Sequence, residues 1–318
     1  MGCALLPGNT SRATFLTLQD KVDVWLPAMQ AICRIHGIPA DALMRIGEGT
    51  NVIFGAGSSS ILKLFPPFWS PLARSEAAVL EYVQGKLGVA IPELLAQGEL
   101  EGWPYLITTR LSGISLGRVW DRMGEGNRSR IAAQIGEMMA RLHALPTGDM
   151  NLPDHDWQSL MQERIATCVA RRREQGLAES WLRQIPSFLE ETAPLYPPDF
   201  TPSVVTGDVH QYHLLVSGDV DSWTLTGYFD FDDALIGFHE YDLAAPGVFM
   251  MAHRPELLRT MLLAYGYPQT TLDDALARRL MAFTLLHRYR DLNWVLEEYV
   301  RDPSCTTLED LTRVFYGI

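Results

Sequence analysis

The spacing of apolar residues changes several times along the 318-residue chain. Over residues 18–35 apolar side chains recur at the interval of a helix, which a glycine and a proline then end. Short β-prone runs follow at residues 42–46, 51–55 and 60–65, separated by turn-forming stretches. This pattern predicts a leading helix and then a three-stranded antiparallel meander.

The next stretch alternates again between the two patterns. A helix is expected over residues 72–84, and two more strands over 93–99 and 105–110. Ser112 and Gly113 then end the strand signal. From Asn127 onward the apolar positions return to helical spacing, which indicates helices that face a core.

One group of short strands interrupts the helical half. They are predicted at residues 203–205, 214–216 and 225–231, around a polar loop. A small β-rich part followed by a larger helical part predicts an α+β architecture. Because the chain has no repeat and no long linker, we expect a short hinge between an N-terminal lobe of residues 1–110 and a C-terminal lobe of 111–318.

Composition narrows the function classes. The chain has 38 acidic and 26 basic residues, a net charge of −12, which disfavours nucleic acid and is compatible with a cationic partner. A charge that only keeps the protein soluble is the alternative. The resemblance described below implies that the cationic partner is a small molecule. No apolar run reaches the ~18 residues of a membrane span. The cysteines, Cys3, Cys33, Cys168 and Cys305, form no C-x-x-C pair, which argues against a disulfide framework and a zinc site. We therefore expect a cytoplasmic protein without a membrane partner.

The densest group of chemistry-bearing residues lies around the predicted hairpin. Asp208 and Asp230 flank neighbouring strands, with His213 between them, so their side chains can converge. Phosphoryl transfer needs a carboxylate beside the attacking hydroxyl and ligands that place a divalent cation on nucleotide phosphates. Aspartates that merely cap turns are the alternative interpretation.

A lysine in an apolar strand provides a second signal. Lys63 is flanked by apolar residues, and a buried lysine needs an anion, which Glu76 or nucleotide phosphates would supply. A lysine that extends from an edge strand into solvent is the alternative. Upstream, Gly47-Glu48-Gly49-Thr50-Asn51 forms a tight turn suited to phosphate oxygens, although Val52 replaces the third glycine of G-x-G-x-x-G.

The order of these features resembles a known family. A glycine-rich turn, strand lysine, helix glutamate, hinge, Asp-x-x-x-x-His and Asp-Phe-Asp follow one another as in the aminoglycoside phosphotransferases, small-molecule kinases that share the protein-kinase fold. Scaffold stretches such as Pro104-Tyr105-Leu106 look closest to the hygromycin B phosphotransferases. The resemblance implies a two-lobed kinase-like fold, ATP or GTP as donor, Mg²⁺ or Mn²⁺ as metal, and an antibiotic acceptor whose phosphorylation confers resistance.

The resemblance also implies residue roles. Asp208 would be the catalytic base, and Asp230 a metal ligand with His213 at the second metal position. The nucleotide would be held by residues of the turn, strand, helix and hinge, namely Lys63, Glu76, Gly49, Thr50, Asn51, Ile61, Thr109 and Leu111. Cationic groups of the acceptor would meet carboxylates at Asp232, Asp233, Glu240, Asp291, Glu297 and Glu298. For the last three a solvated helix face is the alternative.

Three further residues have roles by the same resemblance. His210 would support the geometry of the catalytic loop, and Asp242 would support that loop from the following helix. Trp294 could stack on a sugar ring, although a tryptophan at helical spacing is more often a core residue.

Two residues depart from the family pattern His-Gly-Asp-x-His-x-x-Asn. Thr206 replaces the first histidine, and His213 replaces the asparagine. Because Mg²⁺ prefers oxygen ligands, His213 should weaken Mg²⁺ binding or favour Mn²⁺. These departures leave a nucleotide-binding pseudokinase open as an alternative. A kinase of a small amino alcohol such as choline or homoserine also stays open, because it would use the same catalytic residues. Neither the acceptor hydroxyl nor an oligomeric state follows from the sequence.

Overall fold

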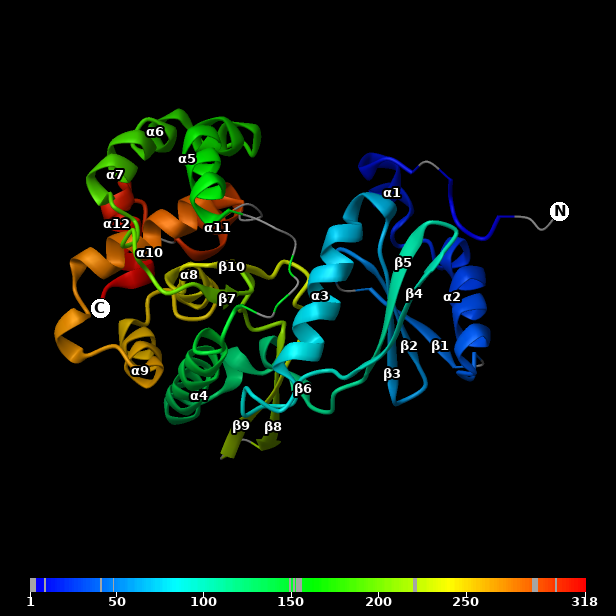
Figure 1. Ribbon diagram of the computed structural model, residues 1–318. Helices are drawn as coiled ribbons and strands as arrows, with labels where there is room; N and C mark the ends of the chain where they lie inside the picture. The colour runs from blue at the N-terminus through cyan, green and yellow to red at the C-terminus, as the bar shows by residue number, and fades with distance from the viewer. Residues whose placement is uncertain are drawn as a thin grey trace.

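The computed structural model shows two lobes side by side, a β-rich lobe that includes the N-terminus and a mostly helical lobe that includes the C-terminus (Figure 1). This arrangement confirms the predicted α+β, two-lobed fold. The structure describes residues 4–8, 10–40, 42–47, 49–148, 150, 152, 156–219, 222–287, 291–300 and 302–318. Cys3 and Glu48 lie outside the described residues.

The N-terminal lobe is built on one antiparallel sheet of five strands in the order β1-β2-β3-β5-β4. Its strands are β1 (Leu43–Ile46), β2 (Val52–Ala56), β3 (Ser60–Leu64), β4 (Leu94–Leu100) and β5 (Trp103–Thr109). The predicted meander and both later strands are therefore confirmed. Within this sheet the last strand in sequence, β5, lies between β3 and β4, which places the predicted hinge directly beside the strand of Lys63.

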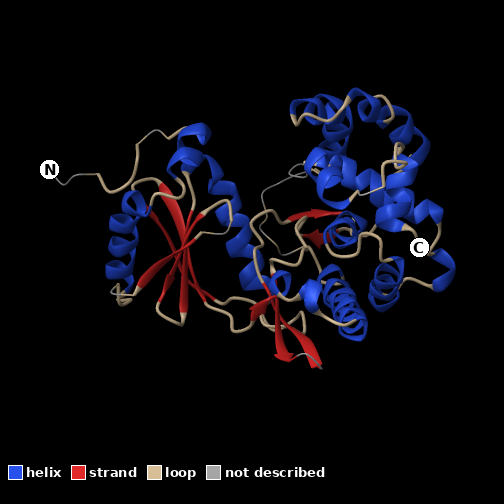
Figure 2. Cartoon of the chain, turned by 180° about the vertical axis from the view of Figure 1, so that it is seen from behind, coloured by secondary structure: helices blue, strands red, loops and turns tan. Residues whose placement is uncertain are grey.

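Helices cover both faces of this sheet. They are α1 (Arg12–Leu18), α2 (Val22–His36) and α3 (Ser70–Val83), and α2 and α3 lie on opposite faces (Figure 2). The leading helix predicted over residues 18–35 is α2, and α1 is a further helix before it that the sequence pattern did not predict. Gly37 ends α2 in the left-handed conformation at φ 65°, which glycine adopts without steric cost.

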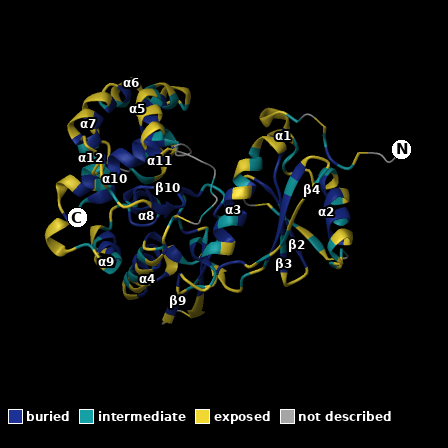
Figure 3. Ribbon diagram, in the orientation of Figure 1, coloured by how far each residue is buried: buried dark blue, intermediate teal, exposed yellow. Residues whose placement is uncertain are grey.

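The C-terminal lobe consists mainly of helices. They are α4 (Glu125–His143), α5 (Trp157–Glu174), α6 (Glu179–Leu182), α7 (Ile185–Thr192), α8 (Glu240–Phe249), α9 (Pro255–Tyr265), α10 (Asp274–Leu286), α11 (Leu292–Tyr299) and α12 (Leu308–Tyr316). Figure 3 shows α8 and α10 at the buried centre, surrounded by helices with exposed outer faces. Short 3₁₀ turns occur at Pro67–Trp69, Leu116–Arg118, Trp120–Arg122 and Gln269–Thr271.

Two small sheets carry the polar loops of this lobe. One pairs β7 (Ser203–Val205) with β10 (Leu235–Gly237), and the other has the order β6 (Ile114–Ser115), β8 (Leu214–Asp219), β9 (Ser222–Tyr228). The strand predicted to reach residue 231 ends at Tyr228. Asp230 follows with a left-handed φ of 73°, so the backbone turns away from the strand there.

The lobes are joined through backbone as well as side chains. Ala90, between α3 and β4, accepts a hydrogen bond from Tyr228 N at 3.0 Å and donates one to Thr226 O at 2.9 Å. The larger hydrophobic core also includes Val79 and Val83 of α3. A lobe boundary after residue 110 stays a prediction. Of the helices within the described residues, none has the length and apolar character that crossing a membrane requires.

Candidate active site

The lysine of β3 is buried and paired, as the sequence predicts. Lys63 is 7% exposed, and its Nζ lies 2.7 Å from Oε2 of Glu76 on α3. The ammonium also lies 5.2 Å from the centre of the Phe65 ring, which belongs to the same face of the strand. The alternating pattern of β3 therefore turns Lys63 inward, and α3 supplies its counter-charge.

Carboxylates of the other lobe approach the same lysine. Lys63 Nζ lies 2.7 Å from Oδ1 of Asp230 and 3.0 Å from Oδ2 of Asp232. Asn51, at the start of β2, donates a hydrogen bond from Nδ2 to Asp232 Oδ2 at 2.9 Å. Residues from both lobes thus form one cluster, which we call the interlobe cluster: Asn51, Lys63, Glu76, Asp230 and Asp232.

The interlobe cluster has more negative than positive charge. Burial raises the pKa of Glu76, to about 8, although Lys63 acts in the opposite direction. Burial and the neighbouring Asp230 also raise the pKa of Asp232. Burial acts to raise the pKa of Asp230 too, but Lys63 and His213 outweigh it and lower that pKa. The cluster therefore has room for a further cation or a proton.

Asp208 lies on the loop after β7, next to two imidazole rings. His210 Nε2 is 3.3 Å from Asp208 Oδ1, and His213 Nδ1 is 3.5 Å from Asp208 Oδ2. His213 Nε2 lies 3.4 Å from Asp230 Oδ2, so this ring stands between the predicted base and the predicted metal ligand. Burial acts to raise the pKa of Asp208, but the hydrogen bond from His210 and the nearby His213 lower it below its usual range.

A buried carboxylate holds the loop of Asp208 in place. Asp242, on α8, is fully buried and accepts hydrogen bonds from the backbone N–H groups of Thr206 at 2.8 Å and Gly207 at 2.5 Å. His287 Nε2 lies 2.5 Å from the carbonyl oxygen of Gly207. The expected support of the loop by Asp242 is confirmed. Sequence reasoning missed His143, whose Nε2 lies 3.2 Å from Asp242 Oδ2; only its place at the end of an amphipathic helix marks it.

Thr206, one of the two departures from the family pattern, belongs to the hydrogen-bonded group around Asp242 that holds the Asp208 loop. Its side chain is fully buried, and its hydroxyl accepts a hydrogen bond from the Tyr228 hydroxyl at 2.8 Å. Burial and the charge of Asp242 raise the pKa of Tyr228 well above its ordinary value, which keeps this phenol protonated and able to donate. Threonine therefore satisfies its polar groups in a place where the family pattern has histidine.

The remaining residues predicted to hold nucleotide lie on β3, on β5 and in the turn before β2. Ile61 pairs with Thr108, and Thr109 pairs with Ser60. Gly49 and Thr50 are exposed in the turn between β1 and β2, and Gly49 has a left-handed φ of 103°. Leu111 is half-buried just beyond β5. Their roles toward a nucleotide remain predictions.

A cavity, which we call the Asp208 pocket, opens beside Asp208. It is lined by residues of the Asp208 loop, α8 and α11, together with His287: Asp208, His210, Gln211, Tyr212, Phe249, His287, Trp294, Glu298 and Tyr299. Trp294 is 47% exposed and lines this pocket, so its interpretation as a core residue is corrected. Of the predicted acceptor carboxylates, Glu298 shares the pocket with Asp208.

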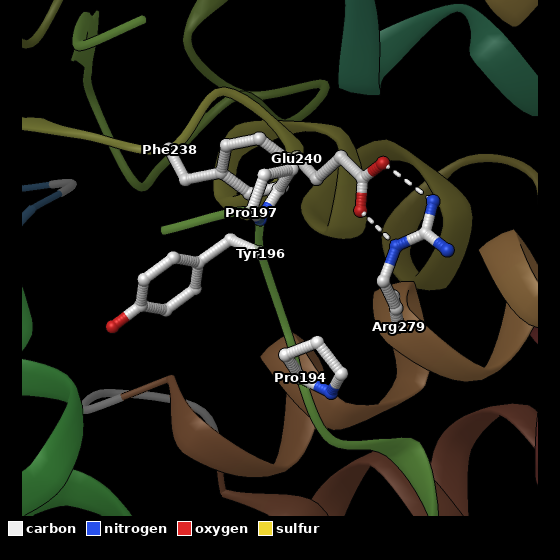
Figure 4. A pocket seen from close by; sticks show the side chains of 6 residues that line it. All are labelled: Pro194, Tyr196, Pro197, Phe238, Glu240 and Arg279. Carbon is white, nitrogen blue, oxygen red and sulfur yellow. Dashed lines mark hydrogen bonds and ion pairs between the residues drawn. The ribbon is translucent and has the colours of Figure 1, made fainter. Parts of the chain in front are cut away.

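Glu240 lies in a different environment from the one expected. Its side chain is buried and makes a two-pronged ion pair with Arg279, each N–O distance being 2.8 Å (Figure 4). Its carboxylate also accepts a hydrogen bond from Tyr267. This pair borders a separate pocket beside Tyr196 and Phe238 (Figure 4). The charge of Glu240 is thus paired with Arg279, away from the pocket of Asp208, and its role toward an acceptor stays a prediction.

Three other predicted acceptor carboxylates have local partners. Asp291 caps α11 and accepts hydrogen bonds from the backbone of Asn293 and Trp294. Glu297 accepts a hydrogen bond from Asn293 Nδ2 at 3.0 Å. Asp232 belongs to the interlobe cluster and does not line the Asp208 pocket. Asp233 is partly exposed in the turn after Asp232.

Comparisons with known proteins agree with this architecture. The model of the phosphotransferase enzyme family matches residues 47–281, so the chain belongs to this family. It is an enzyme family in which transfer of a phosphoryl group is the common reaction. No curated protein sequence matches the chain.

Solved structures of similar fold include three informative complexes. The GDP complex of aminoglycoside 2'-phosphotransferase-IIIa is 21% identical with a TM-score of 0.69, over 88% of this chain and 96% of that one. The streptomycin and ATP complex of APH(2")-IIa is 16% identical with a TM-score of 0.61, over 89% and 97%. APH(3'')-Id from Streptomyces rimosus with ADP and streptomycin is 17% identical with a TM-score of 0.59, over 83% and 99%. These similarities establish a common fold.

Proposed function

We propose that this protein transfers the γ-phosphate of ATP or GTP to a hydroxyl of an aminoglycoside or aminocyclitol antibiotic and so inactivates the drug. One observation carries the proposal: Lys63 Nζ and Asp230 Oδ1, which come from different lobes, lie 2.7 Å apart. The His213 ring lies between Asp230 and Asp208 and contacts both. Membership of the family supports the reaction. The antibiotics bound in structures of similar fold, streptomycin and kanamycin among them, support the acceptor class.

Each residue of the site has a role in this reaction. Asp208 orients the acceptor hydroxyl and takes its proton, and its lowered pKa keeps it ionised at neutral pH. Lys63, held by Glu76, binds the α- and β-phosphates of the donor. The rest of the nucleotide is assigned to Gly49, Thr50, Asn51 and Ile61, and its base to the backbone of Thr109 and Leu111.

The site fits a divalent cation. Asp230 offers a half-buried carboxylate oxygen, the ligand type that Mg²⁺ prefers, and His213 offers an imidazole nitrogen, which Mn²⁺ accepts more readily. These two residues would hold the metal, and Asp232 lies close enough to Asp230 and Glu76 for the three carboxylates to share one cation. When bound, the cation supplies positive charge that offsets the phosphates of the nucleotide.

The resemblance to hygromycin B phosphotransferases makes hygromycin B the first acceptor to test. The net charge of −12 favours such a cationic molecule over an anionic one. We place the activity in the cytoplasm, where ATP and GTP are available. A kinase of a small amino alcohol uses the same residues, so only the choice of acceptor separates the two functions.

The decisive experiment measures phosphate transfer from ATP and from GTP, with Mg²⁺ and then Mn²⁺, to hygromycin B, kanamycin, streptomycin, choline and homoserine. We expect turnover with an antibiotic, and loss of that turnover by a factor of about 10² to 10⁴ in Asp208→Ala, with nucleotide affinity kept. Asp199→Ala, an exposed carboxylate in the loop before β7, is the matched control and keeps full activity.

Other outcomes contradict the proposal. Turnover confined to choline or homoserine identifies a metabolite kinase. Nucleotide binding without transfer to any acceptor identifies a pseudokinase, an interpretation that His213 at the metal position specifically favours. Unchanged turnover in Asp208→Ala rejects the role of this residue as base.

A further inference from the structure

The turn between β1 and β2 is held by a residue that precedes the segment matched to the family. That match covers residues 47–281, so α1 and α2 lie outside it. Gln19, the residue after α1, donates a hydrogen bond from Nε2 to the carbonyl oxygen of Gly49 at 2.8 Å. This bond joins the end of a helix to the turn that is predicted to face nucleotide phosphates.

Arg45, on β1, holds the same turn from a second direction. Its Nη2 donates hydrogen bonds to the carbonyl oxygens of Gln19 and Asn51, each at 3.4 Å, and its Nη1 donates one to Ile53 O at 3.0 Å. A guanidinium carries its donors in a rigid planar fork, so one side chain can bond several carbonyl oxygens at once. Arg45 therefore connects the end of α1 to the turn and to β2.

The end of α1 is itself fixed by the core of the N-terminal lobe. Trp25 of α2 is fully buried, and its Nε1 donates to Leu18 O at 3.0 Å and to Gln19 O at 3.2 Å. The centre of its ring lies 5.9 Å from that of Phe15 on α1 and 5.4 Å from that of Trp103 on β5. Gln19 thus has a position set by packing, which a residue that orients a turn requires.

Arg45 acts from the face of the sheet opposite Lys63. In the antiparallel register Ile53 pairs with Lys63, whereas the next residue, Phe54, pairs with Arg45. Cross-strand partners share a face and successive residues alternate between faces, so Arg45 and Lys63 lie on opposite faces. The Arg45 guanidinium lies 6.0 Å from the centre of the Phe54 ring, in agreement with this placement. Gln19, whose carbonyl oxygen contacts this guanidinium, belongs to the same side.

The bonds to carbonyl oxygens orient the N–H groups of the turn. In a planar trans peptide the C=O and N–H bonds point in opposite directions. Because the carbonyl of Gly49 is bonded to Gln19, the N–H of Thr50 points away from Gln19 and toward the side of Lys63. Gly49 has a φ of 103°, a conformation that glycine adopts without steric cost. Backbone N–H groups arranged in this way are donors for phosphate oxygens.

We propose that Gln19 and Arg45 are positioning residues for the donor nucleotide: they hold the turn so that its N–H groups face the phosphates. The inference rests on the proposed function, which assigns Gly49, Thr50 and Asn51 to the nucleotide. It gives the helical segment before residue 47 a part in the reaction. Because the turn acts on phosphates, its loss should affect a nucleoside triphosphate and not the corresponding nucleoside.

Calorimetric titration with ATP, GTP, adenosine and guanosine in the presence of Mg²⁺ tests this inference without an acceptor, with weak binding measured by displacement. We expect Gln19→Ala to weaken binding of the preferred triphosphate about fivefold or more, and binding of its nucleoside less than about twofold. Arg45→Lys keeps the charge but lacks the planar fork, and should have the same selective effect. Gln97→Ala, at an exposed glutamine of β4 in the same lobe, is the matched control and leaves both affinities unchanged.

The outcomes separate this inference from the proposed function. If wild type binds a triphosphate and Gln19→Ala binds it as tightly as Gln97→Ala does, the inference is overturned and the proposed function stands. Equal losses for triphosphate and nucleoside also overturn it, because they indicate a general change in the lobe. If wild type binds neither ATP nor GTP, the proposed function fails and the inference fails with it.

Discussion

His213 is the residue whose chemistry most distinguishes this site. Its ring contacts Asp208 on one side and Asp230 on the other, at 3.5 and 3.4 Å. Nδ1 also lies 3.1 Å from the carbonyl oxygen of Asp208, a contact that favours a proton on Nδ1 and leaves the lone pair of Nε2 facing Asp230. An imidazole nitrogen beside a carboxylate oxygen is a ligand pair that suits Mn²⁺ better than Mg²⁺.

We predict that His213→Asn shifts the metal preference toward Mg²⁺. The amide oxygen of asparagine is a harder ligand than imidazole, so the ratio of Mn²⁺ to Mg²⁺ affinity should fall about tenfold or more. Calorimetric titration of each metal in the presence of a non-hydrolysable nucleotide measures this ratio without turnover. Asp199→Ala serves as control, and an unchanged ratio in His213→Asn would reject His213 as a metal ligand.

At the scale of elements, the C-terminal lobe depends on a close helix crossing. Gly136 of α4 faces α9, where an added Cβ would overlap the carbonyl oxygen of Met261 and lie 2.9 Å from Tyr265 N. Both neighbours are backbone atoms, which cannot move independently of their helix. The sequence shows Gly136 only as a weak helix former inside an apolar stripe, so this requirement becomes visible in the packing alone.

We predict that Gly136→Ala destabilises the protein by about 2–3 kcal/mol because α4 and α9 must separate. Gly126→Ala, in the first turn of the same helix, is the matched control. Nothing lies within 4 Å of its added Cβ, so it should be neutral or stabilise by up to about 1 kcal/mol. Urea denaturation measures both changes, and equal effects of the two substitutions would contradict the close crossing.

At the scale of the whole molecule, the interlobe cluster links stability to pH. Three carboxylates from both lobes surround one ammonium, and burial raises the pKa of Glu76 from its ordinary 4.5 to about 8. The folded protein therefore keeps a proton that the unfolded chain has lost between these values. Stability from this proton is fully present below pH 4.5 and is lost as pH rises through 8.

We predict that the free energy of unfolding falls by about 1.6 kcal/mol between pH 6.5 and 8. This window avoids His239, whose pKa is lowered from 6.5 to about 4 by burial and by His143, and which changes stability only at more acid pH. Glu76→Gln removes the titrating group and should flatten the dependence, whereas the control Glu256→Gln, at an exposed glutamate of α9, should keep it. A slope that persists in Glu76→Gln would locate the proton elsewhere.

The elements and the main site residues could be predicted from sequence for physical reasons. The β-meander and α4 follow from local periodicity, and Lys63 stands out because a charge in an apolar strand needs a partner. Asp232 and Glu240 show where this reasoning stops. Both are acidic residues near the Asp208 hairpin, yet one binds Lys63 and the other binds Arg279, across 169 and 39 residues of sequence.

By itself, therefore, the sequence determined the fold class, the order of the elements and the presence of Lys63, Asp208 and Asp230, because each depends on local patterning or on an order of motifs. Only the tertiary structure decided how the carboxylates are used. It brought Asp232 to Lys63, neutralised Glu240, and left Glu298 beside an exposed Trp294. A charged side chain interacts most strongly with the opposite charge nearest to it in space. The packing of the lobes and helices determines which residue that is.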